Sequence, residues 1–212
     1  MCGRFAFNGE HWPESIQIEA PTIEPNYNIS PQDDVHCILM QNNVHIITSM
    51  KWGFRPSWSK KSIMQPINAR VESVSEKPMF RDSFENRRCL IPATGWYEWK
   101  TTPLGKVPFY HRLENDEPML FAGIYDDWND RNDRNDSIRT FCILTTDSEK
   151  AISHIHQRMP LIVPNSSVNE WLNHGTVTSN HASFEVYPVD RNVNSTTAQG
   201  LELTFPIRTL FD

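Results

Sequence analysis

Apolar and polar residues alternate over several short stretches of the chain, a periodicity typical of β-strands with one buried face. Proline, glycine and asparagine, which favour turns, bound these stretches. The pattern predicts a protein built mainly from short strands. The stretches cover residues 4–7, 35–40, 44–49, 89–91, 96–100, 109–113, 119–124 and 140–145.

The segments between the strands predict a hairpin, a few helices and one loop. Gln41, Asn42 and Asn43 separate two apolar runs and suit a hairpin turn. Asn165 or Ser166 can cap a helix over 166–172. The repetitive polar segment 128–136 is expected to form an exposed loop. Further helices are expected over 13–18, 78–84 and 149–155.

These elements fit a chain of 212 residues with 15 prolines and no long linker. Such a length suits one domain with a substantial core. We therefore expect one α+β domain over residues 1–212. It should be β-rich, with short helices around a strongly curved, barrel-like antiparallel sheet.

Composition narrows the class of protein. Hydrophobic residues make up 38% of the chain and charged residues 22%, as in globular proteins. No run approaches the roughly eighteen apolar residues of a membrane span, and the first residues lack the apolar core of a secretory signal. We expect a monomeric cytoplasmic protein.

Charge is segregated along the sequence. The net charge of −6 argues against indiscriminate nucleic-acid binding. Residues 51–70 nevertheless contain five basic residues and no acid, whereas residues 114–136 contain eight acids and two arginines. The basic segment predicts a nucleic-acid surface, and two ordinary solvated faces are the alternative.

The four cysteines form no Cys-x-x-Cys pair, and without an export signal free thiols are expected. Cys37, Cys89 and Cys142 lie in apolar, strand-like runs, which predicts burial in the core. Cys2 differs because it becomes the first residue once Met1 is removed, as is usual before a small residue.

A terminal cysteine carries two nucleophiles. Its α-amine has a pKa of roughly 7.7–8, so part of it is unprotonated near neutral pH. The amine can form a Schiff base with an aldehyde, and the neighbouring thiol can close a five-membered thiazolidine ring. Cys2 is thus a candidate aldehyde trap; an incidental small residue at a frayed terminus is the alternative.

Three further segments carry candidate chemistry. Asn68 and Arg70 share one face of an extended segment, where the amide can bind a reacting group and the guanidinium a phosphate. Glu98 lies among three aromatic residues, and desolvation there would raise its pKa toward proton-transfer range. For Asn68 and Arg70 the alternative is a turn asparagine beside a surface arginine. For Glu98 it is a half-exposed ion pair with Lys100.

The third segment contains His154, His156 and Arg158. His156 can exchange protons near neutral pH, and Arg158 can hold a phosphate. The His-x-His spacing also suits metal, but the segment lacks a third ligand, so no metal site is expected. An ordinary exposed histidine is the alternative.

Aromatic and basic residues interleave over 51–61. This combination is typical of single-stranded nucleic-acid binding, in which bases stack on aromatic rings and cations follow the phosphate backbone. Trp52 and Trp58 are candidates for this role, although aromatic residues in such a run are also common in cores.

Six motifs occur in order along the chain, together with QGLEL at 199–203, and as a set they resemble the SOS response-associated peptidase (SRAP) family. Family members shield abasic sites in single-stranded DNA. The motifs are MCGRF at residues 1–5, YNISP at 27–31, WGF at 52–54, NARVE at 68–72, GWYEWK at 95–100 and HQRMP at 156–160.

The resemblance implies roles for these residues. Cys2 would form a thiazolidine with the ring-opened sugar after Met1 is removed, autocatalytically or by an aminopeptidase. Asn68 would orient the amine and the lesion, Glu98 would act as acid and base, and His156 would protonate the sugar oxygen. No cofactor is implied. DNA contacts are implied for Arg4, Arg70, Arg158 and Trp52, the last near a wedge at a single-strand to double-strand junction.

Two other functions fit the same residues. In an N-terminal-nucleophile hydrolase or thiol peptidase, Cys2 would attack a carbonyl, with its own amine or His156 as base. A non-covalent nucleic-acid reader would instead use the basic segment 51–70, and its binding would depend on salt but not on Cys2.

Overall fold

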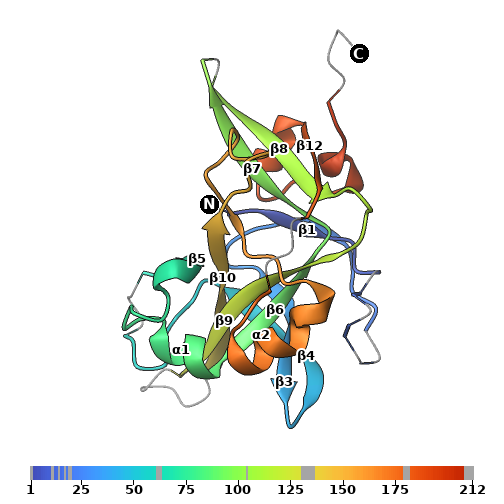
Figure 1. Cartoon of the computed structure of the whole chain (residues 1–212). Coiled ribbons are helices and arrows are strands. Elements are labelled where there is room, and N and C mark those ends of the chain that lie inside the picture. The colour runs from blue at the N-terminus through green and yellow to red at the C-terminus, as the bar shows by residue number, and fades with distance from the viewer. Residues whose placement is uncertain are drawn as a thin grey trace.

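Two β-sheets form the framework of the protein in this computed structural model (Figure 1). Among the described residues, one sheet has five strands and the other has seven. The structure describes residues 2–10, 12–13, 15–16, 18, 21–60, 64–103, 105–129, 137–178 and 182–207.

Part of the larger sheet closes into a barrel. Its last strand, β10 (Ser137–Asp147), pairs antiparallel with β9 (Met119–Asn129) and parallel with β4 (Val44–Trp52), so the strand order returns on itself. The strands β3 (Asp34–Gln41) and β6 (Arg88–Ala93) complete the ring. The predicted curved sheet is confirmed, but the barrel is mixed rather than purely antiparallel.

Two short strands extend the barrel from β10. Strand β5 (Asn68–Arg70) runs parallel to β10, with Asn68 opposite Ile143. Strand β11 (Arg158–Pro160) runs antiparallel to it, with Arg158 opposite Asp147. Thr145 pairs with Arg70 of β5 on one side and with Pro160 of β11 on the other, so segments more than eighty residues apart flank the same strand.

The smaller sheet is antiparallel and places the start of the chain against the barrel. Phe5 of β1 packs its ring against Trp52 of β4 and Phe121 of β9, with ring centres 5.2 and 5.9 Å apart. Cys2 therefore precedes a strand that lies where the two sheets meet (Figure 1). The strands are β12 (Phe184–Pro188), β8 (Gly105–Leu113), β7 (Gly95–Thr102), β1 (Phe5–Phe7) and β2 (Asn26–Ile29), in spatial order.

The barrel strands bury both faces, so many of them are continuously apolar. Cys37 and Leu39 of β3 belong to a core shared with β1 and β7. Ile38 between them faces a second core, which includes Phe80 and Trp171. Helices α1 (Arg81–Asn86) and α2 (Val168–His174) cover this second face.

The hairpin between β3 and β4 confirms the predicted turn. Asn42 and Asn43 have φ of 51° and 61°. A two-residue hairpin turn of this type needs left-handed backbone at both positions, and asparagine tolerates it better than most residues.

The helix predictions are partly confirmed. Helix α1 overlaps the expected 78–84, and α2 with the 3₁₀ turn η2 (Asn165–Ser167) covers the expected 166–172. The prediction for 149–155 is wrong, because this segment forms successive turns. The expected helix over 13–18 lies partly outside the described residues. The remaining 3₁₀ turns are η1 (Val71–Ser73), η3 (Arg191–Asn194) and η4 (Leu201–Thr204).

Two other predictions, on the cysteines and on the 128–136 segment, can be compared with the structure. Cys37, Cys89 and Cys142 are buried free thiols, as expected. Trp128 does not belong to an exposed loop: it lies near the end of β9 with 2% exposure, under the guanidinium of Arg55 at 4.4 Å. The rest of that predicted loop, residues 130–136, lies outside the described residues. No described helix is long and apolar enough to cross a membrane.

Candidate functional site

A cavity of about 530 Å³ opens beside the first residues of the chain. We call it the Cys2 cavity, because Gly3 and Arg4 in its wall directly follow Cys2. The wall combines the N-terminal segment, strands β7 and β8, the segment before β11 and the turn η3. The lining residues are Gly3, Arg4, Glu98, Trp99, Lys106, His156 and Asn194.

Cys2 lies fully buried behind this wall. Its thiol donates to the carbonyl oxygen of Arg4 over 3.9 Å. Burial raises the pKa of the Cys2 thiol well above its ordinary value, and the nearby Glu98 carboxyl raises it further. The thiol is therefore held protonated at neutral pH. Met1 lies outside the described residues.

Asn68 holds Cys2 in place from the first residue of β5. Its side-chain amide donates to the carbonyl oxygen of Cys2 at 2.8 Å. The other polar atom of this side chain, Oδ1, is buried and accepts no hydrogen bond within the described part of the protein. An acceptor is thus available close to the Cys2 backbone.

Glu98 lies in the middle of β7 and is only 3% exposed. Burial raises the pKa of its carboxyl, and the positive charge that His156 can carry opposes this shift. The expected desolvation is confirmed. A carboxyl with a raised pKa is suited to giving and taking protons near neutral pH.

His156 precedes β11 and is half-buried in the cavity wall. The backbone N–H of Arg158 donates to its Nδ1 at 3.0 Å, which places the proton of the neutral ring on Nε2. The carbonyl oxygen of Arg158 is also 3.0 Å from Nδ1 and can accept when the ring is doubly protonated. Both charge states of His156 therefore have a backbone partner.

The structure brings Cys2, Asn68, Glu98 and His156 together from four distant parts of the sequence. Asn68 contacts Cys2 directly, while Glu98 and His156 line the same cavity, where His156 lowers the pKa that burial raises in Glu98. A nucleophile, an amide and two proton-transfer groups thus meet at one place.

Two of the predicted DNA-contacting arginines are already bonded within the protein. The Arg4 guanidinium, 8% exposed, donates to Asn28 Oδ1 at 2.7 Å and to the carbonyl oxygen of Val193 at 2.9 Å. Arg158 binds both carboxylate oxygens of Glu72 at 2.8 Å and Asp147 at 2.5 Å. Both arginines therefore fix the walls of the Cys2 cavity.

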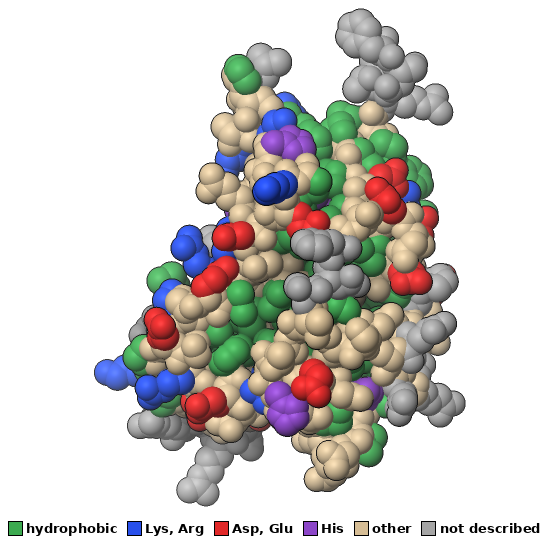
Figure 2. All heavy atoms as spheres, in the orientation of Figure 1, with side chains coloured by type: hydrophobic (Ala, Val, Ile, Leu, Met, Phe, Trp, Pro, Cys, Tyr) green, Lys and Arg blue, Asp and Glu red, His purple; other side chains and the backbone are tan. Residues whose placement is uncertain are grey.

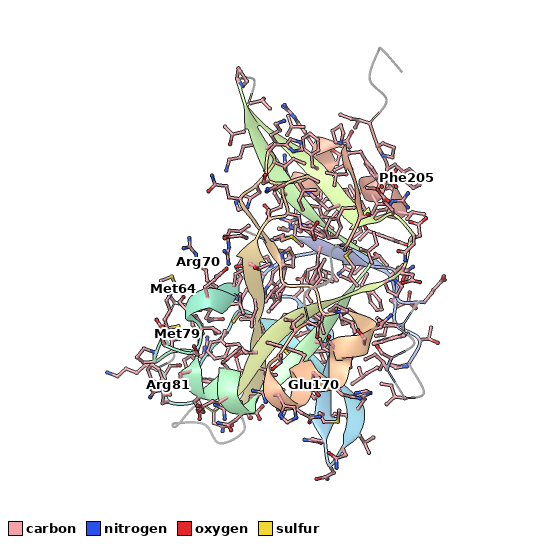
Figure 3. The ribbon with its side chains drawn as sticks, in the orientation of Figure 1. Met64, Arg70, Met79, Arg81, Glu170 and Phe205 are labelled. Atoms are coloured by element: carbon pink, nitrogen blue, oxygen red, sulfur yellow. The ribbon has the colours of Figure 1, made fainter. Side chains whose placement is uncertain are left out.

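Arg70 and Trp58 lie on the surface, as expected. Arg70 is exposed at the end of β5, and the Trp58 side chain is 56% exposed. Figure 3 shows Arg70, Met64, Met79 and Arg81 along one edge of the molecule. Over β5 and α1 at the left of Figure 2, lysine and arginine side chains are interspersed with acids. This edge therefore combines basic, acidic and apolar side chains.

Trp52, which is predicted to contact DNA, does not lie on the surface of the protein. Trp52 is fully buried, and its indole N–H donates to the carbonyl oxygen of Ile67 at 2.9 Å. Its ring also stacks on Phe141 of β10 at 6.3 Å. The ring is part of the core between the two sheets and has no surface to offer a base.

Sequence patterns missed other residues of the site. Lys106 reaches the cavity because β7 and β8 pair with Thr101 opposite Lys106, and such a register is not visible in the sequence. His111 stacks on Trp96 at 4.7 Å, and burial lowers its pKa to about 4. Glu72, the partner of Arg158, belongs to the NARVE motif and could have been noticed there. Among the described residues, no group of three or more His, Cys, Asp or Glu could hold a metal ion.

Comparison with known sequences gives consistent similarities. A model of the SOS response associated peptidase (SRAP) family matches residues 1–196. Abasic site processing protein YoqW of Bacillus subtilis is 33% identical over 199 residues, covering 90% of this chain and 88% of that protein. Abasic site processing protein YedK of Escherichia coli is 30% identical over 230 residues, covering 98% of this chain and all of that protein.

Solved structures share the fold. A protein from Bacteroides thetaiotaomicron superimposes with a TM-score of 0.80 at 20% identity, over 98% of this chain and 100% of that chain. A phage-related protein from Bordetella bronchiseptica reaches a TM-score of 0.70 at 26% identity, over 93% of this chain and 99% of that chain. The arrangement of two sheets is therefore common to all three.

Proposed function

The chain belongs to the SOS response associated peptidase (SRAP) family, and we propose that it captures abasic sites in single-stranded DNA as a covalent crosslink to Cys2. The names of its relatives, abasic site processing proteins, support the lesion as substrate. The observation that carries the proposal is the position of Cys2, which Asn68 holds beside a cavity lined by Glu98 and His156.

The chemistry uses both nucleophiles of Cys2. Removal of Met1 frees the α-amine, which adds to the aldehyde carbon of the ring-opened sugar. One water leaves and a Schiff base forms. The Cys2 sulfur then bonds to the same carbon, and the thiol proton passes to the imine nitrogen. An aldehyde and an aminothiol thus give a thiazolidine ring and one water, with no change in oxidation state.

The raised pKa of the thiol sets the order of these steps. A protonated thiol is a weak nucleophile, so the amine attacks first. Once the imine forms, the sulfur attacks within the same residue, where its effective concentration is high. The buried thiol therefore acts as the second nucleophile.

The three neighbouring side chains assist proton transfer and orientation. Glu98 can take a proton from the attacking amine and return it to the departing oxygen. His156, whose Nε2 carries the proton of its neutral ring, can donate to the sugar oxygen as the ring opens. Asn68 Oδ1 can accept from the amine and align it with the aldehyde.

The DNA strand is proposed to follow the edge that carries Arg70 and to reach the exposed Trp58. Arg70 is placed to hold a phosphate, and Trp58 to stack on an unpaired base. Arg4 and Arg158 lie closer to the lesion and keep the cavity walls in place. Exposed bases are available on a single strand, including one beside a duplex junction.

Intact mass spectrometry tests the proposal. The purified protein should lack Met1, and an abasic single-stranded oligonucleotide should shift its mass by one strand less one water. Cys2→Ala should form no stable adduct. Cys2→Ser keeps the amine, so it should be trapped only after borohydride reduces the Schiff base. A stable, unreduced adduct on either variant would refute the thiazolidine.

A thiol peptidase is the second candidate, and the same cysteine would serve it. That activity needs a reactive thiolate, whereas burial raises the pKa of the Cys2 thiol. The protonation of the thiol thus favours the aldehyde trap over attack on a peptide bond. Turnover of peptide substrates by a protein that emerges with unchanged mass would favour the peptidase.

A further inference from the structure

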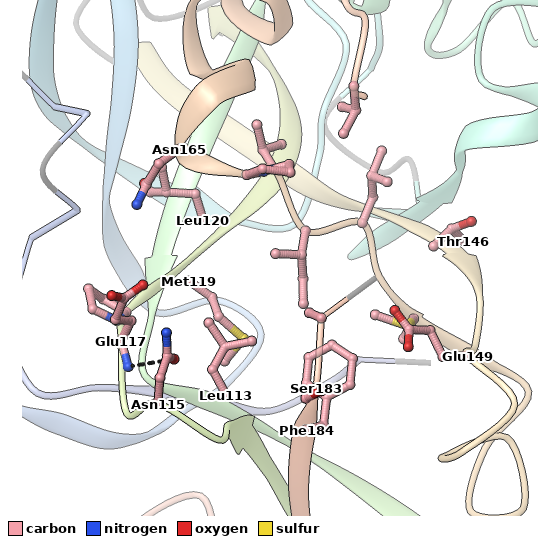
Figure 4. Close-up of a pocket in the computed structure, with 18 of the residues that line it drawn as sticks. Leu113, Asn115, Glu117, Met119, Leu120, Thr146, Glu149, Asn165, Ser183 and Phe184 are labelled. Atoms are coloured by element: carbon pink, nitrogen blue, oxygen red, sulfur yellow. Dashed lines mark hydrogen bonds between the residues drawn. The ribbon is translucent and has the colours of Figure 1, made fainter. Parts of the chain in front are cut away.

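A second and larger cavity, of about 770 Å³, is lined in part by the end of β10 and by Met159 of β11. The end of β8, the start of β9, the segment from β11 to η2 and the start of β12 surround it (Figure 4). Its floor is apolar and includes Leu113, Met119, Met159, Leu161 and Phe184. We call it the acidic cavity because of the residues at its rim.

The rim carries one sign of charge. Glu114, Glu117, Asp147 and Glu149 line it, and its described lining contains no lysine, arginine or histidine. In Figure 4, Glu117 and Glu149 lie on opposite sides, with Leu113 and Met119 between them. Carboxylates around an apolar cavity repel phosphates, so a nucleic acid is not expected to bind here. They instead favour a cationic ligand that also has an apolar part.

The size and polar groups of the cavity suit part of a peptide. Ligand cavities commonly measure about 300–1,000 Å³, are largely apolar and place a few polar groups at the edge. Here Asn115, Asn165 and Ser183 lie among the lining residues and can bond to a peptide backbone. A large apolar side chain fits the floor, while basic side chains on either side reach the acids.

We propose that the acidic cavity binds a short segment of a partner protein, in which one large apolar side chain is flanked by lysine or arginine. The site goes beyond the capture of abasic DNA. Asp147 at its rim also contacts Arg158, and Met159 in its floor follows Arg158 in the chain. A bound partner would therefore lie beside the crosslinking site without occupying the Cys2 cavity.

Fluorescence anisotropy with labelled, capped hexapeptides tests the proposal on the full chain. The set places Leu, Met, Phe or Trp at the centre, flanked by Lys or Arg in one series and by Glu in the other. At least one basic series member should bind with a Kd below about 1 mM, and the matching Glu-flanked peptide should bind about tenfold more weakly or not at all. Added salt should weaken the binding.

Charge reversal at the rim provides the matched variants. Glu117→Lys combined with Glu149→Lys should weaken binding of the basic peptide by about tenfold or more. Glu85→Lys carries a new charge on the exposed surface of α1, outside the cavity, and should bind like the wild type. Thermal unfolding checks that each variant is folded, and the double variant should still crosslink abasic DNA at the wild-type rate.

Several results would overturn the proposal. They are the absence of binding across the basic series, equal binding of basic and acidic peptides, and unchanged binding by the double variant. Phenethylamine binding as tightly as the best peptide would assign the cavity to small apolar amines instead. A dimer that dissociates in the double variant would assign it to a second copy of the chain. The crosslinking rate is a separate readout, so failure here leaves the role of Cys2 untouched.

Discussion

The Cys2 cavity and the acidic cavity take neighbouring residues of the chain, His156 before β11 and Met159 within it, yet they place their carboxyl groups differently. Glu98 is almost fully buried beside Cys2, and burial raises its pKa. Glu114 and Glu117 stand exposed around an apolar hollow. A carboxyl removed from water becomes suited to proton transfer, whereas one left in water keeps its charge and can attract a partner. The difference in burial thus distinguishes the site proposed for chemistry from the site proposed for recognition.

The largest effect is expected from removing the buried acid. Glu98→Gln keeps the shape of the side chain but cannot exchange a proton. The rate of adduct formation with abasic DNA should fall roughly 10²–10⁴-fold, the usual contribution of a general acid–base group. Quenched time courses resolved by denaturing gel electrophoresis would measure it.

Glu117→Gln is the matched control for this change, because it alters an exposed carboxyl of the acidic cavity. Its crosslinking rate should equal that of the wild type. Equal slowing of both variants would show that the comparison between the cavities is wrong.

The second effect concerns two tryptophans of the same sequence segment. Trp52→Ala removes a ring from the core and should lower the free energy of unfolding by about 3–5 kcal/mol. Trp58→Ala changes an exposed ring and should alter stability by less than about 0.5 kcal/mol. Its DNA affinity should instead fall by about 1–3 kcal/mol if a base stacks there. Urea denaturation and fluorescence titration with single-stranded DNA measure the two quantities.

The third effect is a pH dependence of stability from His111. Its pKa in the folded state is lowered to about 4, so unfolding takes up a proton between that pH and the ordinary value. Stability present at neutral pH should therefore be lost as the pH falls from about 6.5 to 4, by at most about 3 kcal/mol.

Glu98 acts in the opposite direction. Because its folded pKa is raised, its contribution to stability is lost as the pH rises through that value.

Denaturation at several pH values tests the role of His111. The free energy of unfolding of His111→Gln should fall less steeply below about pH 6.5 than that of the wild type, with the exposed His174→Gln as control. If His111→Gln loses stability at acidic pH as steeply as the wild type, His111 is not the cause of that loss.

The smallest effect is expected from the ion pair between Glu72 and Arg158. Glu72→Gln removes one charge from a partly exposed ion pair, which contributes little on its own. Since Arg158 donates its backbone N–H to His156, looser packing should slow crosslinking by about threefold. Glu76→Gln, an exposed change nearby, is the control. Tighter DNA binding with an unchanged rate would mean that Glu72 competes with phosphate for Arg158.

The long strands of the barrel could be predicted from the sequence, because each carries its own apolar pattern and its own turn residues. The turn at Asn42 and Asn43 could also be predicted, because it depends on the backbone preference of these two residues alone. Strands β2, β5, β11 and β12 were not predicted as strands, since they are three to five residues long and are defined by distant partners. Their formation depends on long-range pairing and not on local propensity.

In the candidate site, too, the residues could be recognised from local motifs, whereas their burial could not. Cys2, Asn68, Glu98 and His156 stand in motifs that could be recognised in order, and the structure brings them together. Trp52 and Trp128 look alike in the sequence as aromatic residues beside polar ones, yet both are buried. The face that a side chain turns to the core depends on strand register, which the sequence alone leaves undetermined.

Burial of the Cys2 sulfur has one more consequence. Peroxides attack exposed thiolates to form sulfenic acid, so a protonated sulfur without solvent contact is shielded from oxidation. In the proposed function Cys2 is consumed on one lesion and is not regenerated by turnover. Its buried position would then keep the sulfur unoxidised until the protein meets an abasic site.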